Sequence, residues 1–494
     1  MTRRWRWALL AVLLTAGGHP VTPAPLASTP AAPPAALPDS LVRWLDGLGG
    51  DSLQIQLAVA DLASPDGTLL YSRLGELRQT PASLMKLVTA SAALELWGPR
   101  HRLVTRAGYD PALVTEDRRT GISHAEALWV QPAGDPTLSR QDLVRLFQQI
   151  WEEGVDRVDR VRILPDRFDP LRLGPGWMWD DAGGAYAARP SLLTVQGNSL
   201  FAQSGPGGWE LPGSALMSVE TEPAARGATA RLERDWPHAR DRFAFMAPLL
   251  SAGPPPRSGR WWVRPPEPAC NVEYPDSLFR SVCFEAAQQV FQAAAPPSLD
   301  WIAAPRPGFA WHRHAGPPLV QVLDSMLTES WNLGAECVFQ GLAAAFPLRG
   351  VPGWERAAGL CREVLLDSLG VTDWYRQVDG SGMSRYNAVS PRQFVQVLRA
   401  MERRHPGLLA GLLPHPGEGT LSTAAPHLPA GVGLAAKTGT LRGVTGLAGY
   451  LTRQDRPRLA FCLLITGQGS ARSAVQLRNE MTARLAAWLA ASPG

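Results

Sequence analysis

Strand-like segments near both ends of this chain put the strongest constraint on its fold. Residues 53–62 alternate apolar and polar side chains as a half-buried strand does, and 68–72 follow after Asp66-Gly67, a pattern typical of a hairpin. Three more strand-like stretches and an amphipathic helix close the chain, at 432–437, 444–451, 458–466 and 473–491. We therefore expect an α/β domain, an antiparallel sheet flanked by helices, that both termini complete.

The length of 494 residues indicates more than this one domain, because a single core usually stops growing at roughly 250–300 residues. Residues 101–304 have strand-like and helical pieces of their own and contain Pro/Gly clusters. We interpret them as a large, mostly-β insertion. The surrounding domain would then consist of a first part, 39–100, and a second part, 305–494.

The first 38 residues have the features of an export signal and a linker. Residues 1–18 combine three arginines with the apolar run 8–14 and small residues suited to signal peptidase. Residues 19–38 are rich in Pro and Ala. No later segment approaches 18 consecutive apolar residues, so we expect no transmembrane span in the mature chain and a location in the periplasm or cell envelope.

Composition argues against several other functions. The 48 basic residues are scattered rather than gathered into a stripe, and the net charge is only +4, so we expect no nucleic-acid partner. No Cys/His spacing resembles a metal site, and we expect neither a metal nor another cofactor. Of the five cysteines, Cys270 and Cys283 lie close together in sequence, and an exported chain could oxidise them.

Three short motifs bring together the residue types of acyl transfer. They are Ser83-Leu84-Met85-Lys86, Ser330-Trp331-Asn332 and Lys437-Thr438-Gly439-Thr440. The chain has only two lysines, and both fall in these motifs, whereas its other cationic side chains are arginines. An ammonium group can lose its proton near neutral pH when it is desolvated, but a guanidinium cannot. The placement of the lysines therefore favours a role in proton transfer.

Ser83 and Lys86 have the spacing of a nucleophile and its base. Apolar residues at helical spacing follow Ser83, so we expect it at a helix N-terminus with Lys86 one turn further on the same face. A serine hydroxyl needs a base, and a lysine, with a usual pKa of ~10.4, needs burial or a second cation such as Lys437 to become one. The backbone amides of Ser83 and Thr440 would form an oxyanion hole.

With these motifs the chain resembles the class C low-molecular-mass penicillin-binding proteins, a D-alanyl-D-alanine carboxypeptidase/endopeptidase family. Residues 134–138, 176–181 and 379–385 are also similar to recurrent stretches of that family. The resemblance implies a β-lactamase/transpeptidase-like domain with a large insert. It also implies hydrolysis of peptidoglycan stem peptides that end in D-Ala-D-Ala, and covalent inhibition by β-lactam antibiotics.

The resemblance also implies a role for each motif residue. Ser83 would attack the carbonyl between two D-alanines, with Lys86 as base and Ser330 relaying the proton to the leaving amine. Asn332 would hold the substrate amide. The terminal carboxylate would be bound by one cation and two hydroxyls, those of Lys437, Thr438 and Thr440. Trp331 departs from the family, in which Asp is commoner at that position.

Asp181 is a candidate partner for the side-chain amine of the third stem-peptide residue, although a structural carboxylate is an equal alternative. Two other functions remain open: a β-lactamase of the same fold, and an inert peptidoglycan-binding scaffold. No Glu-X-X-X-Asn follows Ser330 to hold a deacylating water, which argues against the first. Intact nucleophile, base and relay residues argue against the second. The balance of carboxypeptidase and endopeptidase activity stays undetermined.

Overall fold

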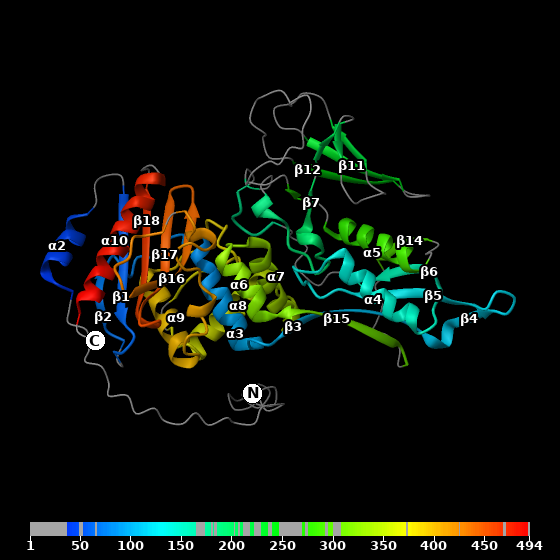
Figure 1. Ribbon diagram of the computed structural model, residues 1–494, viewed down its shortest axis with the longest axis horizontal. Helices are drawn as coiled ribbons and strands as arrows, with labels where there is room; N and C mark the ends of the chain where they lie inside the picture. Colours follow the sequence, from blue (N-terminus) through cyan, green and yellow to red (C-terminus); the bar gives the residue numbers. More distant parts are fainter. Residues whose placement is uncertain are drawn as a thin grey trace.

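The computed structural model describes residues 37–48, 53–64, 67–164, 173–178, 181, 185–201, 308–371, 374–423, 425–467 and 471–492, together with seven strands and one helix between 203 and 299. The predicted signal peptide and nearly all of the linker lie outside these residues. Two sheets, each with its own helices, lie side by side along the long axis of the molecule (Figure 1).

The first sheet joins the two ends of the chain, as the sequence predicted. Its order is β16-β17-β18-β1-β2, and every neighbouring pair is antiparallel. β1 forms the hairpin with β2 on one side and pairs with β18 on the other. The strands are β1 Leu53–Asp61, β2 Leu69–Arg73, β16 Val432–Leu441, β17 Val444–Arg453 and β18 Arg456–Gly467.

Helices cover both faces of this sheet, and the side chains of β18 show how. Leu459, Phe461 and Leu463 face a core shared with α2 (Asp39–Gly47) and α10 (Ala471–Ala491). The intervening residues, Ala460, Cys462 and Leu464, face a second core. Because successive strand residues point to opposite faces, burial on both requires the continuous apolar run that the sequence has here.

The second core consists of the sheet and a helical layer that carries the candidate site. α3 follows the 3₁₀ turn η1, whose middle residue is Ser83, and lies against the sheet beside the later helices. The helices are α3 Met85–Trp97, α6 Leu319–Thr328, α7 Asn332–Ala345, α8 Gly353–Asp367 and α9 Pro391–Arg404.

A second sheet, with its own core, forms the predicted insertion. Its order is β14-β6-β5-β3-β15, with β4 paired to β5, and it contains parallel as well as antiparallel pairs. Two helices pack on it, but strands make up the larger part of its described helices and strands, as the sequence predicted. The elements are β3 Arg102–Tyr109, β4 Val114–Asp117, β5 Ile122–Gln131, α4 Arg140–Glu152, β6 Arg157–Ile163, α5 Pro275–Phe291, β14 Ala295–Leu299 and β15 Ala310–Pro318.

The boundary of the insertion lies later than residue 304, where the sequence placed it. β15 begins at Ala310 and pairs with β3 along the edge of the second sheet. The chain therefore leaves the first unit through β3 and re-enters it through β15, and α6 follows directly. Two adjacent strands thus connect the units (Figure 1).

Short strands fill the part of the insertion between β6 and α5, and they pair as β13 with β7, β8 with β9, and β10-β11-β12. They are β7 Ser199–Phe201, β8 Gln203–Gly205, β9 Gly208–Glu210, β10 Ser218–Thr221, β11 Thr229–Asp235, β12 Arg240–Met246 and β13 Ala269–Asn271. Cys283 is a free, buried thiol in α5, and the side chain of Cys270, the partner that the sequence left open, lies outside the described part of the chain.

Candidate active site

Ser83 lies at the start of the α3 segment, where the sequence placed it, and is half-buried. Lys86, one helical turn later, is fully buried. Lys86 Nζ is 3.0 Å from Ser83 Oγ, so the i+3 spacing brings nucleophile and amine into hydrogen-bond contact. Burial lowers the pKa of Lys86 to about 7, against the opposing effect of the carboxyl groups of Glu336 and Asp379.

Lys86 has three oxygen partners from three segments of the chain. Besides Ser83, Nζ donates to Asn332 Oδ1 at 2.6 Å and to the Ser381 carbonyl at 2.8 Å. The last two oxygens can only accept hydrogen bonds, whereas the Ser83 hydroxyl can also donate one. Once Lys86 is neutral, its two N–H bonds match the two acceptors and its lone pair faces Ser83. The contacts therefore direct the lone pair of the amine to the hydroxyl.

A buried carboxyl group fixes the backbone that supplies the Ser381 carbonyl. Glu336 on α7 is fully buried and accepts hydrogen bonds from the amides of Gly380 and Ser381 at 2.9 and 2.7 Å. Burial, together with the charge of Asp379, raises the pKa of Glu336 to about 8. Its two oxygens hold consecutive peptide units and so set the position of the carbonyl that Lys86 contacts.

Asp379 holds the other half of the same loop. Its Oδ1 accepts from the Gly382 amide and Asn387 Nδ2, at 3.0 and 2.7 Å, and Oδ2 accepts from the Ser384 amide at 2.6 Å. Trp177 Nε1 also donates to Oδ2, at 2.9 Å. Two stretches that the sequence analysis treated separately, 176–181 and 379–385, are therefore in contact through this carboxyl group.

The loop approaches the nucleophile so closely that only glycine fits at one position. Gly382 has φ 88°, and a Cβ atom there would lie 1.9 Å from the Ala82 carbonyl oxygen. Ala82 itself has φ 53°, a left-handed conformation that costs a residue other than glycine roughly 1–3 kcal/mol. Backbone strain thus occurs directly before Ser83, at a turn packed against the 379–385 loop.

Lys437 extends along β16 on the opposite side of the site. It is fully buried, and Nζ donates to the Thr438 carbonyl at 3.0 Å. Burial and the nearby charge of Lys86 both lower the pKa of Lys437. The Thr438 hydroxyl donates to Thr420 Oγ1 at 2.8 Å, and Thr440 is exposed at the end of the strand. A buried cation beside the exposed hydroxyl group of Thr440 suits an anionic group.

Ser330 lies between α6 and α7, two residues before α7 begins at Asn332, and has a φ of 59°. Within the part of the chain that the structure describes, no hydrogen bond joins its hydroxyl to Lys86 or Ser83. Asn332, two residues later, does reach Lys86 through Oδ1, and its Nδ2 donates to the Tyr186 carbonyl at 2.9 Å. The second motif therefore contacts the amine through its third residue.

Asp181 is connected to the site through Tyr186. The Tyr186 hydroxyl donates to Asp181 Oδ1 at 2.7 Å, and the carbonyl of the same tyrosine accepts from Asn332. Asp181 is partly exposed, so one of its oxygens is used by Tyr186 while the group stays accessible to solvent. The sequence analysis missed Tyr186, Glu336 and Thr420, because none lies in a motif that carries reactive groups.

The model of the D-Ala-D-Ala carboxypeptidase 3 (S13) family matches residues 50–240 and 302–490. The chain belongs to the D-Ala-D-Ala carboxypeptidase 3 (S13) family. A D-alanyl-D-alanine carboxypeptidase of Actinomadura sp. (strain R39) is 30% identical over 454 residues, which cover 85% of this chain and 79% of that protein. The resemblance predicted from the motifs is confirmed.

Solved structures confirm the fold of this S13 protein. The penicillin binding protein 4 (dacB) of Haemophilus influenzae matches with a TM-score of 0.67 at 20% identity, covering 90% of this chain and 99% of that one. A second structure of it contains a β-lactam and matches with a TM-score of 0.63, at 18% identity and the same coverage. A predatory peptidoglycan endopeptidase of Bdellovibrio bacteriovorus gives a TM-score of 0.50 at 14% identity, covering 90% of this chain and 94% of that one.

Proposed function

We propose that the chain is a serine-type D-Ala-D-Ala carboxypeptidase in which Ser83 is acylated and Lys86 is the general base. The observation that carries this proposal is the contact of Lys86 Nζ with Ser83 Oγ at 3.0 Å, in a site where burial brings the lysine pKa to about 7. A base whose pKa lies near the working pH combines a sizeable neutral fraction with enough basicity to accept the proton.

The reaction proceeds in two steps. Neutral Lys86 takes the proton of the Ser83 hydroxyl, whose oxygen attacks the carbonyl between the two D-alanines. The tetrahedral intermediate expels the terminal D-alanine amine, which receives the proton through the Ser330 hydroxyl. Water then attacks the ester, and the Ser83 oxygen leaves with a proton returned through Lys86. Two backbone amides, those of Ser83 and Thr440, stabilise the oxyanion in both steps.

Substrate binding is assigned to the residues around this pair. Asn332 positions Lys86 through Oδ1 and holds the peptide amide through the second N–H of Nδ2, whose first N–H donates to the Tyr186 carbonyl. Lys437 neutralises the terminal carboxylate, which accepts hydrogen bonds from Thr438 and Thr440. The substrates are peptidoglycan stem peptides, and β-lactam antibiotics acylate Ser83 as substrate mimics. We place the enzyme in the cell envelope, exported by the signal predicted at residues 1–18.

The deciding experiment is the intact mass of the protein after brief exposure to benzylpenicillin, followed over time. We expect one stable penicilloyl group on the wild type and none on Ser83→Ala. An adduct that forms and disappears within seconds would instead identify a β-lactamase, and no adduct would favour the scaffold. Release of D-alanine from a peptide ending in D-Ala-D-Ala, absent in Ser83→Ala, tests the substrate class.

Endopeptidase activity is a second candidate for the same site. A peptide cross-link also contains a D-Ala carbonyl, so the chemistry at Ser83 would be identical, and the peptidoglycan endopeptidase of Bdellovibrio has the same fold. Incubation with cross-linked muropeptide dimers separates the two activities. Conversion of dimers to monomers would establish the endopeptidase, whereas release of D-alanine alone would leave only the carboxypeptidase.

We also propose that Asp181 pairs with the side-chain amine of the third stem-peptide residue. Its partial exposure and its connection through Tyr186 to Asn332 support this role. Asp181→Ala should raise KM only for peptides that bear a free amine at that residue. Tyr186→Phe is the matched control, because it removes the hydrogen bond and keeps the charge. Equal effects of Asp181→Ala on peptides with and without the amine would contradict the assignment.

A further inference from the structure

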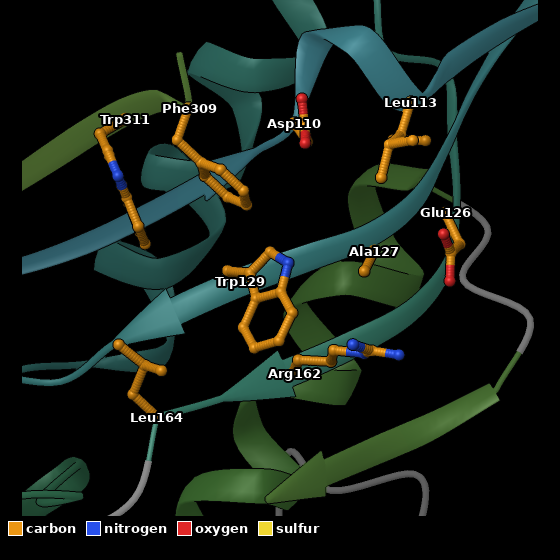
Figure 2. Close-up of a pocket in the computed structure, with 10 residues that line it drawn as sticks. Asp110, Leu113, Glu126, Ala127, Trp129, Arg162, Leu164, Phe309 and Trp311 are labelled. Atoms are coloured by element: carbon orange, nitrogen blue, oxygen red, sulfur yellow. The ribbon is translucent and has the colours of Figure 1, made fainter. Parts of the chain in front are cut away.

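A cavity of about 250 Å³ is lined by residues of β5, β6 and β15 and of the segments next to them (Figure 2). These strands belong to the second sheet, which lies beside the unit that contains the helical layer (Figure 1). Nothing in the proposed reaction uses this cavity. Its lining combines three aromatic rings with two carboxyl groups and one guanidinium, and it consists of Asp110, Leu113, Ala125, Glu126, Ala127, Trp129, Arg162, Leu164, Phe309 and Trp311.

The aromatic rings form a connected, partly exposed wall. The ring of Phe309 lies 6.5 Å from that of Trp129 and 5.3 Å from that of Trp311, centroid to centroid. All three side chains are only half-buried. Figure 2 shows the rings toward one end of the cavity, with Glu126 and Leu113 toward the other. A soluble protein rarely leaves neighbouring large rings accessible unless they bind something.

The neighbouring strand is adapted to this wall. Gly108 on β3 stands opposite Trp311 on β15, and a Cβ atom there would lie 2.8 Å from the Trp311 ring and 2.4 Å from the Ala310 carbonyl. The absence of a side chain at Gly108 therefore lets the indole lie across the strand. Core packing does not account for it, because Trp311 is outside the buried core of this unit.

Hydrogen-bond donors and acceptors both surround the rings. The Arg162 guanidinium stacks 5.0 Å from the Trp129 ring centroid, which presents a rigid set of donors beside an aromatic surface. The carboxyl groups of Asp110 and Glu126 supply acceptors on other sides of the cavity (Figure 2). A ligand that fits must therefore have an apolar face and an edge of hydroxyl or amide groups that donate and accept.

We propose that this cavity binds one N-acylated hexosamine unit of the peptidoglycan glycan strand. A pyranose ring has a C–H face that packs on aromatic rings, and its hydroxyl and acylamino groups project from its edge. The cavity lies below the roughly 300–1,000 Å³ typical of drug-sized ligands, which suits a single sugar ring. The choice of this sugar rests on the proposed function, because the glycan strand carries the stem peptides.

Such a site would raise the local concentration of substrate. A glycan strand held at the insertion tethers its stem peptides, and binding of one to Ser83 then becomes intramolecular. Hydrolysis of polymeric peptidoglycan should therefore depend on the cavity, whereas hydrolysis of a free peptide should not. This difference also separates the sugar site from the chemistry at Ser83.

The test is co-sedimentation of the full chain with insoluble sacculi from which an amidase has removed the stem peptides. We expect the wild type to bind, and Trp129→Ala and Trp311→Ala to bind about tenfold or more weakly, as is usual for truncation of a central aromatic side chain. Trp151→Ala is the matched control, because Trp151 is a half-exposed tryptophan of α4 outside the cavity. It should bind like the wild type.

Glu126→Gln is a variant that should not disturb folding, because it changes an exposed side chain and removes no packing atoms. It should also weaken binding. Failure of the wild type to bind peptide-free sacculi, or full binding by both cavity tryptophan variants, would overturn the proposal. Equal binding to cellulose, a glucose polymer without acylamino groups, would overturn the choice of an aminosugar. Benzylpenicillin acylation should be unchanged in all four variants, because none of them changes the site of Ser83. If the wild type itself were not acylated, only the proposed function would be contradicted.

Discussion

The two sheet units of this chain hold their charged side chains in different surroundings. In the five-stranded unit, Lys86 and Lys437 are fully buried, and Lys86 is surrounded by three oxygens at 2.6 to 3.0 Å. In the insertion, Arg162 and Glu126 border a cavity that is open to solvent. The first arrangement changes the protonation of its lysines, whereas the second keeps its charged side chains at the wall of an open cavity.

The two surroundings follow from what each kind of site requires. A serine nucleophile needs an amine whose proton affinity has been lowered, and desolvation is the largest cause of the shift at both lysines. Burial of polar groups is costly unless each has a partner, which explains the network of Glu336 and Asp379 behind Lys86. Recognition of a sugar ring needs exposed flat surfaces instead, and these tolerate half-buried charges.

The largest expected effect comes from replacing the amine of the buried site. Lys86→Arg keeps the positive charge, but a guanidinium does not give up its proton, so the base is lost. We expect acylation by benzylpenicillin to slow by about 10²–10⁴-fold, the usual contribution of a general base. The rate of adduct formation by intact mass measures this. Acylation within about tenfold of the wild type would exclude Lys86 as the base.

A matched pair of phenylalanines tests whether the two units are separable. Phe147 is fully buried in the core of the insertion, and Phe339 is fully buried on α7 of the first unit. Replacement of either by alanine should cost about 3–5 kcal/mol of unfolding free energy. Only Phe339→Ala should also slow acylation, because a Cβ atom at Gly380 would touch Phe339, which places this ring against the active-site loop.

Calorimetry and the acylation rate together measure that pair. Phe147→Ala should lower the melting temperature of one transition and leave adduct formation within about twofold of the wild type, since changes at distant sites rarely couple. If Phe147→Ala slowed acylation as much as Phe339→Ala, the insertion would be part of the catalytic unit. The two sheets would then not be independent units.

A comparison of two glycines distinguishes the effect of backbone strain from the effect of a steric clash. Gly382 and Gly350 both have positive φ, 88° and 78°, but a Cβ atom would clash with Ala82 only at Gly382 and would meet nothing within 4 Å at Gly350. Gly350→Ala should therefore lower the free energy of unfolding by about 1 kcal/mol and leave the acylation rate unchanged. Gly382→Ala should cost about 1–3 kcal/mol more from overpacking and slow acylation as well. Equal acylation rates in the two variants would show that the loop does not position Ser83.

The sequence was informative where local patterns determine the structure. Strand β18 is buried on both faces, so the predicted strand 458–466, with its apolar run 459–465, was recognisable. The i+3 spacing of Ser83 and Lys86 was sufficient to place them together. The fold class, the family and the carboxypeptidase function predicted from the motifs are confirmed by the comparisons. The roles of the individual residues stay predictions until the variants are measured.

The features that the sequence did not predict depend on tertiary contacts, which no local pattern encodes. Ser381 supplies a backbone carbonyl to Lys86 across 295 residues of sequence, and any residue type has such a carbonyl. The boundary at 304 was misplaced because β15 is an edge strand, which tolerates the polar and proline-containing sequence AWHRHAGPP. The cavity on the second sheet was missed because Trp129 on β5 lies far along the chain from Phe309 and Trp311, and the rings become neighbours only when β5 and β15 pair with the two sides of β3.

The smallest expected effect is the pH dependence of acylation, and it distinguishes the two buried lysines. Lys86 has a pKa of about 7 and reacts when neutral, so the rate should rise about tenfold from pH 6 to pH 8. Lys437 must stay charged to bind an anionic group, and its lowered pKa should end the plateau below the pH at which an ordinary lysine titrates. Lys437→Arg fixes that charge, so the decline at high pH should disappear while the rise through about 7 remains. A wild-type profile without the rise at low pH would mean that burial has not made Lys86 a base. Burial of charged side chains would then not distinguish the five-stranded unit from the insertion chemically.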